Sequence, residues 1–189
     1  MIGKKQQRMI VKEALKALGG KSVEQLSRRV CERFLDSSLF ANSSVIMGYM
    51  AMRLEASPNL IMQRALDEGK QVVVPVVDFE RKEIVPARLK SLTEGLIKDN
   101  YGIWQPEIID PIDVELIDVV IVPALGYDTS GRRLGRGGGY YDKFLAKKGL
   151  NAKKCGFCLS CQILEEIATD THDQPVDYLV TEDTFNKTL

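Results

Sequence analysis

The sequence predicts an α/β fold of three layers, with helices on both faces of a mainly parallel, Rossmann-like sheet. Short apolar runs rich in β-branched residues, such as Gln71 to Val77 and Asp118 to Val122, alternate along the chain with stretches of helical periodicity. Helices and strands in this order form right-handed crossover units, whose strands run parallel. The length of 189 residues is enough for one well-filled core and short for two. We therefore expect a single domain over residues 1–189.

Two amphipathic helices are expected before the first strand. Residues 4–18 place apolar side chains on one stripe and end at a glycine pair; the stripe holds Ile10, Ala14, Ala17 and Leu18. Ser22 is expected as the N-cap of the second helix. The buried stripe of that helix is expected to hold Val23, Leu26, Val30 and Phe34.

The rest of the chain is expected to build the sheet. A helix is predicted over residues 59–67, and strands are predicted over residues 44–50, 71–77, 81–87, 118–122, 152–160 and 176–180, with a tail from residue 181 onward. The segment 51–58 follows the first strand. Loops at the carboxyl ends of parallel strands face the ligand crevice of open α/β sheets, so this segment is expected to line a site.

A glycine-rich stretch follows the strand 118–122 and carries most of the chemical information. Between Gly131 and Gly139 it has five glycines and three arginines, and an apolar spacing typical of a helix then begins. Glycines allow backbone N–H groups to approach a ligand, and arginines bind phosphate oxygens with paired donors. The stretch therefore predicts a loop that binds a polyphosphate, with Asp142 as a carboxylate for a metal ion on the phosphates.

Other interpretations of the stretch stay open on motif grounds alone. Glycine triplets also form flexible turns with solvated arginines beside them. Neither standard nucleotide signature is present, because no Lys-Ser/Thr pair follows the glycines and the last glycine of the dinucleotide fingerprint would fall at Tyr140.

The run Leu134-Gly-Arg-Gly-Gly-Gly-Tyr-Tyr-Asp142 resembles the signature of the 5-formyltetrahydrofolate cyclo-ligase family, also called 5,10-methenyltetrahydrofolate synthetases. It is preceded by Pro123-Ala-Leu-Gly-Tyr-Asp128 and Gly131-Arg-Arg133, so about twenty positions fit. The resemblance implies an ATP-dependent ring closure that converts 5-formyltetrahydrofolate to 5,10-methenyltetrahydrofolate. It implies ATP as co-substrate and Mg²⁺ as metal.

The resemblance also implies which residues bind the nucleotide and the metal. On the first helix, Lys4-Lys-Gln-Gln-Arg8 is similar to a Lys-x-x-x-Arg pair of the family that contacts the nucleotide, although Gln7 stands where the family usually has leucine. The ATP-binding residues implied are Lys4, Lys5, Arg8, Arg133, Leu134, Gly135, Arg136, Gly137, Gly138, Gly139, Tyr140 and Tyr141. Asp142 and Asp173 are the implied ligands of Mg²⁺, and Arg136 and Tyr141 the expected catalytic residues. Some family members have lysine in place of Gly138.

A folate site is implied beside the nucleotide. In the family, a glutamate after the first strand binds the pterin, and Glu55 has this place. The other residues implied are Met50 at the strand end, Trp104 in a Gly-Ile-x-Gln/Glu-Pro stretch, Tyr140 and Gln162. On position alone, Glu55 is more ordinarily a surface charge near a helix start, whereas Trp104 equally fills a gap in the core.

Composition limits the partners. Lys plus Arg and Asp plus Glu are both 26, and this zero net charge argues against nucleic-acid binding. No apolar run reaches the roughly 20 residues of a membrane span, and the N-terminus is too charged for a secretory signal, so we expect a cytoplasmic protein. We also expect a monomer. Cys155, Cys158 and Cys161 are interpreted as buried small residues, because a strand would turn Cys158 away from the other two.

Two other functions are compatible with the pattern. The same sheet-and-loop architecture serves sugar-phosphate isomerases and coenzyme A transferases, although no catalytic glutamate or isomerase base can be placed here. A nucleotide-binding regulator without turnover is the alternative outside the enzymes.

Overall fold

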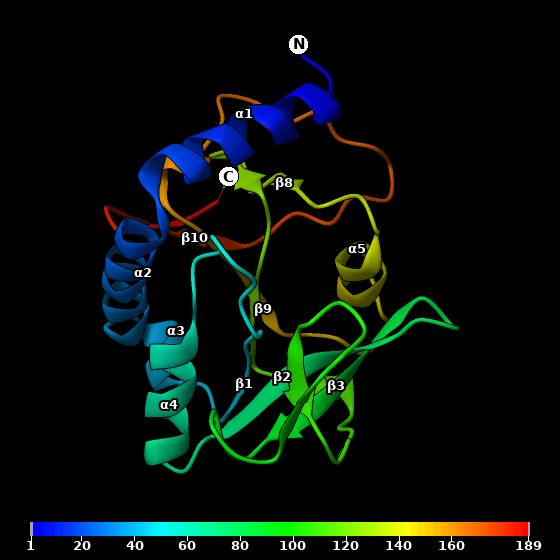
Figure 1. Ribbon diagram of the computed structural model, residues 1–189. Coiled ribbons are helices and arrows are strands. Elements are labelled where there is room, and N and C mark those ends of the chain that lie inside the picture. Colours follow the sequence, from blue (N-terminus) through cyan, green and yellow to red (C-terminus); the bar gives the residue numbers. More distant parts are fainter. Residues whose placement is uncertain (1, 189) are drawn as a thin grey trace.

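The computed structural model describes residues 2–188 and has a seven-stranded central sheet in the order β11-β10-β9-β6-β1-β2-β3 (Figure 1). The strands β10, β9, β6, β1 and β2 run parallel, and the edge strands β11 and β3 pair antiparallel to their neighbours. Their bounds are β1 Val45–Met47, β2 Gln71–Asp78, β3 Glu83–Leu89, β6 Val119–Val122, β9 Lys153–Phe157, β10 Tyr178–Val180 and β11 Phe185–Lys187. The predicted α/β class with a mainly parallel sheet is confirmed.

Helices cover both faces of the sheet, but unequally. On one face α1 (Lys4–Leu18), α2 (Gly20–Leu35), α3 (Ser38–Ala41) and α4 (Asn59–Asp67) pack over a large apolar cluster. On the other face a second cluster contains Phe144 and Leu145 of the short helix α5 (Tyr140–Leu145) and Val114 of the 3-10 helix η1 (Val114–Leu116). Successive strand residues alternate between the faces: Ile46 belongs to the first cluster and Met47 to the second. Among the described helices, none is long and apolar enough to cross a bilayer.

Two details of the helices differ from the prediction. The bounds of α1 are as expected, but its buried residues are Gln7, Val11 and Leu15, whereas Ile10 is 47% exposed. Both stripes have helical spacing, and only the direction from which the sheet approaches selects between them. The N-cap of α2 is Gly19, so Ser22 lies inside the helix, because α2 starts directly after α1 with no intervening loop.

Several short elements were missed. The predicted tail contains β11, which closes one sheet edge. Residues 78–115 contain the hairpin of β4 (Leu96–Lys98) and β5 (Trp104–Pro106), and a second hairpin joins β7 (Gly126–Tyr127) to β8 (Arg133–Leu134). Strands of two or three residues are too short to show a period of two, so sequence periodicity cannot reveal them.

Candidate active site

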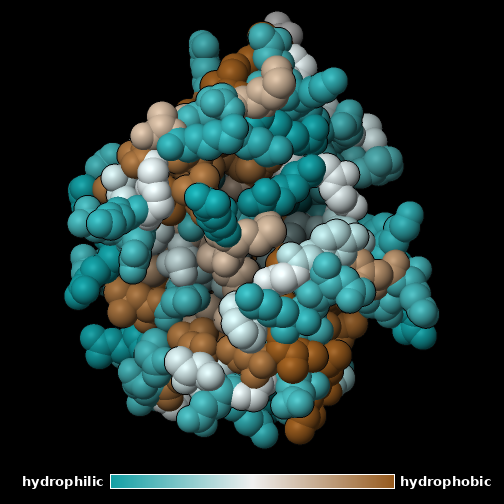
Figure 2. Space-filling view, in the orientation of Figure 1, coloured by the Kyte–Doolittle hydropathy of each residue, from teal (hydrophilic) through white to brown (hydrophobic). Residues whose placement is uncertain are grey.

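A pocket of about 870 Å³ lies at the carboxyl ends of the central strands, on the side of the sheet where α5 packs. This volume is within the range of sites that bind small molecules. Figure 2 shows the molecule hollowed near the centre of this face, between hydrophilic side chains above and below. Four parts of the chain line it: the start of α1, the segment 49–55 after β1, the stretch 133–146, and the segment 170–174. Residues of β2, β3 and the β4–β5 hairpin also line it: Pro75, Val77, Ile84, Asp99, Ile103, Trp104 and Gln105.

The glycine-rich loop starts from the β7–β8 hairpin, whose turn is held by a buried carboxylate. Asp128 is 1% exposed and accepts hydrogen bonds from the backbone N–H groups of Ser130, Arg132 and Ile167. At Gly131 the φ angle is 81°, and an added Cβ would lie 2.5 Å from the carbonyl oxygen of Val176. Only glycine fits at that position. The turn therefore delivers the loop to the pocket from a rigid base.

The loop ends at α5, which has Gly139 as N-cap in the left-handed region with a φ of 71°. The loop glycines Gly135, Gly137, Gly138 and Gly139, with Arg136, all line the pocket. A helix of six residues contributes little dipole, so any anion bound here depends mainly on the arginines and on backbone N–H groups.

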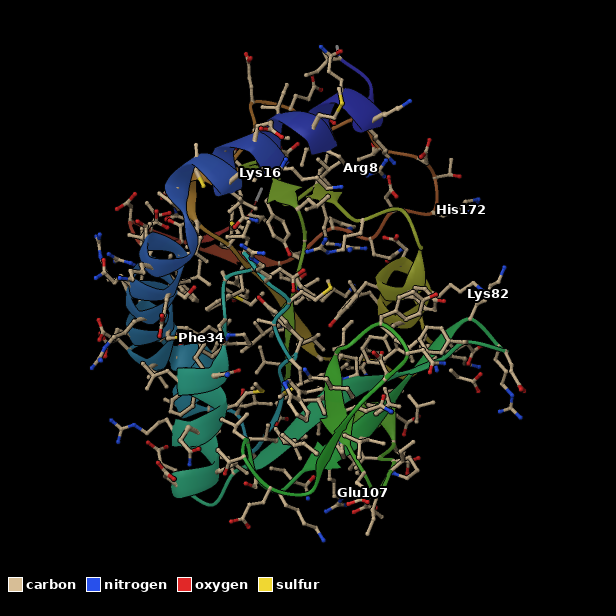
Figure 3. The ribbon with its side chains drawn as sticks, in the orientation of Figure 1. Arg8, Lys16, Phe34, Lys82, Glu107 and His172 are labelled. Carbon is tan, nitrogen blue, oxygen red and sulfur yellow. The ribbon has the colours of Figure 1, made fainter. Side chains whose placement is uncertain are left out.

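The N-terminal helix reaches the loop directly. Arg8 Nε donates to the carbonyl oxygen of Gly135 at 2.9 Å, and Figure 3 shows Arg8 below α1, on the side of the β7–β8 hairpin. One turn earlier, Lys4 Nζ lies 2.6 Å from a carboxylate oxygen of Asp170 and 2.6 Å from one of Asp173. Burial tends to lower the pKa of Lys4, but the two carboxylates raise it above its ordinary value. Lys4 and Arg8 thus line the pocket, and Asp170 is a partner of Lys4 that the sequence did not reveal.

Arg133 is the most buried cation of the site. Its side chain is 5% exposed and forms an ion pair with Asp142, and its Cζ lies 5.8 Å from the ring centroid of Tyr141. Within residues 2–188, Arg133 Nε and the Tyr141 hydroxyl are buried without a hydrogen-bond partner. A buried N–H donor without a partner is unfavourable, so the Nε–H of Arg133 is available to donate to an anionic ligand. Burial, with a smaller contribution from Glu55, raises the pKa of Tyr141, which stays protonated at neutral pH.

The two predicted metal ligands come from different parts of the chain and lie close together. Asp142 Oδ1 accepts from the N–H of Gln174, the residue after Asp173. Burial alone would raise the pKa of Asp173, but Lys4 outweighs this effect, so the pKa lies below its ordinary value. In each carboxylate, one oxygen has no hydrogen bond from a described residue: Oδ2 of Asp142 and Oδ1 of Asp173. Among residues 2–188, no group of three or more potential metal ligands is found.

Three of the predicted folate residues come from outside the glycine-rich loop and line the same pocket. Glu55, Met50 and Trp104 all line it, Glu55 and Met50 after β1 and Trp104 at the start of β5. Trp104 is 47% exposed, and Lys98 Nζ lies 4.8 Å from its ring centroid. Glu55 forms an ion pair with Arg136 of the glycine-rich loop at 2.6 Å. Residues predicted for two different ligands are therefore in contact.

Three predicted site residues are outside the pocket. Lys5 is exposed on α1, and Leu134 is fully buried in a small cluster with Leu125 and Ile167. Gln162 is 2% exposed, and its amide donates to the carbonyl oxygens of Ala124 and Leu125 and accepts from the N–H of Leu159. The expectation that Gln162 contacts folate is therefore not supported, because both ends of its amide hold loop backbone.

Replacing Gln162 by leucine tests this structural role. Leucine has a similar size but leaves one N–H and two carbonyl groups without their side-chain partner, which costs about 1–3 kcal/mol of stability. We expect a lower free energy of unfolding in urea and an unchanged KM for the substrates. A KM raised tenfold or more with an unchanged free energy of unfolding would instead indicate that Gln162 contacts a substrate.

Several pocket residues had no recognisable signal in the sequence. Pro75, Val77 and Ile84 belong to β2 and β3, where apolar residues were expected as ordinary core. His172, on the outer segment in Figure 3, and Lys143 of α5 also line the pocket. A position at the carboxyl end of a strand was the one general indicator available.

Known proteins resemble this chain over nearly its whole length. Residues 1–182 match the model of the 5-formyltetrahydrofolate cyclo-ligase family. A probable 5-formyltetrahydrofolate cyclo-ligase of Schizosaccharomyces pombe is 32% identical over 197 residues, covering 94% of each chain. The 5-formyltetrahydrofolate cyclo-ligase of Mus musculus is 28% identical over 183 residues, covering 92% of this chain and 90% of its own. The solved structure of the 5,10-methenyltetrahydrofolate synthetase of Aquifex aeolicus is similar with a TM-score of 0.84 and 29% identity, covering 97% of this chain and 92% of its own.

Proposed function

The chain belongs to the 5-formyltetrahydrofolate cyclo-ligase family, and we propose that its active site is the pocket between the glycine-rich loop and the β4–β5 hairpin. The protein is an enzyme of the ligase class, which uses ATP to close 5-formyltetrahydrofolate into 5,10-methenyltetrahydrofolate. The observation that supports the location is the meeting of two residue sets in one cavity. Lys4, Arg8, Arg133 and Arg136 line it together with the glycines, and Met50, Glu55 and Trp104 line the same cavity.

The chemistry explains why a triphosphate and a folate need one pocket. An amide oxygen is a poor leaving group, so the formyl oxygen attacks the γ-phosphorus of ATP and ADP leaves. The resulting phosphate ester is attached to an iminium carbon. The second folate nitrogen attacks this carbon and loses its proton, and phosphate leaves with the former formyl oxygen, giving the methenyl bridge.

Phosphoryl transfer depends mainly on positioning and on charge stabilisation. Arg133 and Arg136, with the backbone of residues 135–139, are assigned to the phosphates, and Lys4 and Arg8 reach them from α1. Arg136 stabilises the charge that develops on the transferred group, because it lines the pocket and its side chain is 43% exposed. Tyr140 and Tyr141 lie between the two ligands, and the protonated Tyr141 hydroxyl is a hydrogen-bond donor for an oxygen there.

Mg²⁺ is assigned to Asp142 and Asp173. The donor set fits this ion, which commonly takes one or two carboxylates together with nucleotide phosphates and water. Each carboxylate keeps one oxygen without a hydrogen bond, although Arg133 and Lys4 occupy the other oxygen of each. A bound Mg²⁺ would neutralise phosphate charge. Arg133 and Lys4 would then turn from the carboxylates to the phosphates.

The test of the function is the appearance of the methenyl chromophore. Purified protein is mixed with Mg-ATP and 5-formyltetrahydrofolate, and absorbance is followed with time. Absorbance is expected to rise only when all components are present. A rise without ATP would contradict the phosphorylation step, and no rise with ATP would contradict the function.

Replacing Trp104 by alanine is expected to raise the KM for the folate about tenfold with kcat changed less than about twofold, because stacking on an aromatic ring is worth about 1–3 kcal/mol. The measurement is initial rates across folate concentrations at saturating ATP. Trp104→Phe is the matched control and is expected to keep most of the affinity. An equal loss in kcat and in affinity would contradict a binding role for this ring.

Family membership favours the ligase over the isomerase, transferase and regulator alternatives. The single-domain organisation, the monomeric state and the cytoplasmic location expected from the sequence remain predictions, as does the architecture shared with sugar-phosphate isomerases and coenzyme A transferases.

A further inference from the structure

One ion pair joins the two halves of the pocket. Arg136 Nη2 and Nε both donate to Glu55 Oε1, at 2.6 and 3.0 Å. The second oxygen, Oε2, accepts from the N–H of Met52 at 2.8 Å. The Glu55 side chain is 9% exposed and held in its own turn, whereas Arg136 is 43% exposed on the loop. Of the two partners, Arg136 is therefore the one that can move.

The other ion pairs of the site have a different character. Lys4 pairs with Asp170 and Asp173, and Arg133 pairs with Asp142. In these pairs both partners lie on the side proposed for the phosphates and the metal. In the Arg136–Glu55 pair, one partner is proposed for the phosphates and the other for the folate ring.

The folate ring and Arg136 compete for the same carboxylate by the same chemistry. A guanidinium presents N–H donors in a planar fork. The aminopyrimidinone ring of a folate presents a ring N–H beside an amino group, which is a fork of the same kind. The carboxylate of Glu55 cannot pair fully with both.

We propose that Glu55 holds Arg136 while the pocket is empty, and that the folate ring displaces it so that Arg136 turns to the phosphates of ATP. Glu55 is then a positioning residue that couples the two substrates, in addition to its contact with folate. This inference rests on the proposed function, since it needs both ligands in this pocket.

Coupling of this kind has a defined sign. ATP that binds first must break the Arg136–Glu55 pair to use Arg136, whereas ATP that binds after folate finds the arginine released. Because two N–H groups of Arg136 donate to the single oxygen Oε1, while the Arg136 side chain is 43% exposed, each ligand is expected to tighten the other about three- to tenfold. Thermodynamic linkage requires the same factor in both directions.

The experiment is titration calorimetry with a non-hydrolysable imido analogue of ATP, in the presence of Mg²⁺. On the wild-type protein, saturating 5-formyltetrahydrofolate should lower the Kd of the analogue about three- to tenfold. The reciprocal titration of folate, with and without the analogue, should give the same factor. Absence of the effect in both directions overturns the inference.

The Glu55→Gln variant gives the sharper outcome. Glutamine still accepts from the Met52 N–H but loses the charge that holds Arg136. The variant is therefore expected to bind the analogue without folate about three- to tenfold more tightly than the wild type does. A Kd that is unchanged or weaker overturns the inference. Glu68→Gln is the matched control. It breaks the ion pair between Arg64 of α4 and Glu68 at the C-terminal end of that helix, and neither residue lines the pocket. This variant should leave the Kd of the analogue unchanged.

Failure of the coupling and failure of the proposed function can be distinguished. If the wild-type protein forms the methenyl product but the Kd of the analogue does not respond to folate, the coupling is wrong and the function stands. If no product forms under any condition, the proposed function is wrong, and the coupling with it. Thermal unfolding of Glu55→Gln verifies that the variant is folded, and the reciprocal wild-type titrations need no variant.

Discussion

Arg136→Ala is expected to lower kcat about a hundred- to a thousandfold, the cost seen when one preorganised donor to transition-state charge is removed. The reason is the position of Arg136 at the edge of the cavity between the glycine-rich loop and Glu55. Released from Glu55, its guanidinium can bind oxygens of the transferred phosphoryl group. The measurement is kcat and KM for both substrates from the rate of chromophore formation.

The effect on folate affinity separates this expectation from general damage to the site. Removing Arg136 leaves Glu55 without a competitor, so the KM for folate is expected to stay constant or fall. Arg136→Lys is the matched control: it keeps the charge without the fork and should recover only part of kcat. A kcat within about threefold of the wild type would mean that another group stabilises the transferred phosphoryl.

Asp128→Ala is expected to lower the free energy of unfolding by about 3–5 kcal/mol, because it removes a buried acceptor of three backbone N–H groups, each costly to leave unsatisfied. The carboxylate is 1% exposed, accepts from three backbone N–H groups, and lies 3.1 Å from Arg132 Nε. Its loss leaves those donors unsatisfied and frees both the β7–β8 turn and the segment at residue 167. Urea denaturation gives the value.

Asp128→Asn isolates the contribution of the charge. Asparagine keeps one carbonyl oxygen for the turn N–H groups but presents an amide NH₂ where the carboxylate accepted a further bond. It should therefore cost less than alanine, about 1–2 kcal/mol. Equal costs for the two variants would show that the hydrogen bonds of the turn contribute little and that the charge and the bond from the Ile167 N–H decide. Because this turn supports the loop, both variants are also expected to reduce turnover.

The predicted site residues that line the pocket were recognisable for local reasons. The stretch from Gly131 to Asp142 contains its own turn, its own cations and its own helix start, so its character can be identified without the rest of the fold. The segment after β1 was predicted by a general rule on strand ends, which placed Glu55 and Met50 in the pocket.

The positions that differ from expectation depend on long-range packing. Gln162 follows a strand end just as Glu55 does, but its amide is turned inward to the backbone at Ala124 and Leu125. Leu134 lies between pocket residues in the sequence and is nevertheless fully buried, because β8 places it in the interior. Helical spacing alone does not decide whether Ile10 or Val11 of α1 is buried, because this depends on the direction from which the sheet approaches the helix.

The sequence by itself determined the α/β class, most strands and helices, and the chemistry of the glycine-rich loop, since periodicity and turn residues act over short distances. Only the tertiary structure decided that Lys4 pairs with Asp170 and Asp173, that Arg133 pairs with Asp142, and that Arg136 and Glu55 hold each other across the pocket. The physical reason is that charges distant in the chain find partners only when the sheet brings their loops to one edge. The pairing of Arg136 with Glu55, which are proposed for different substrates, therefore could not be predicted from the sequence.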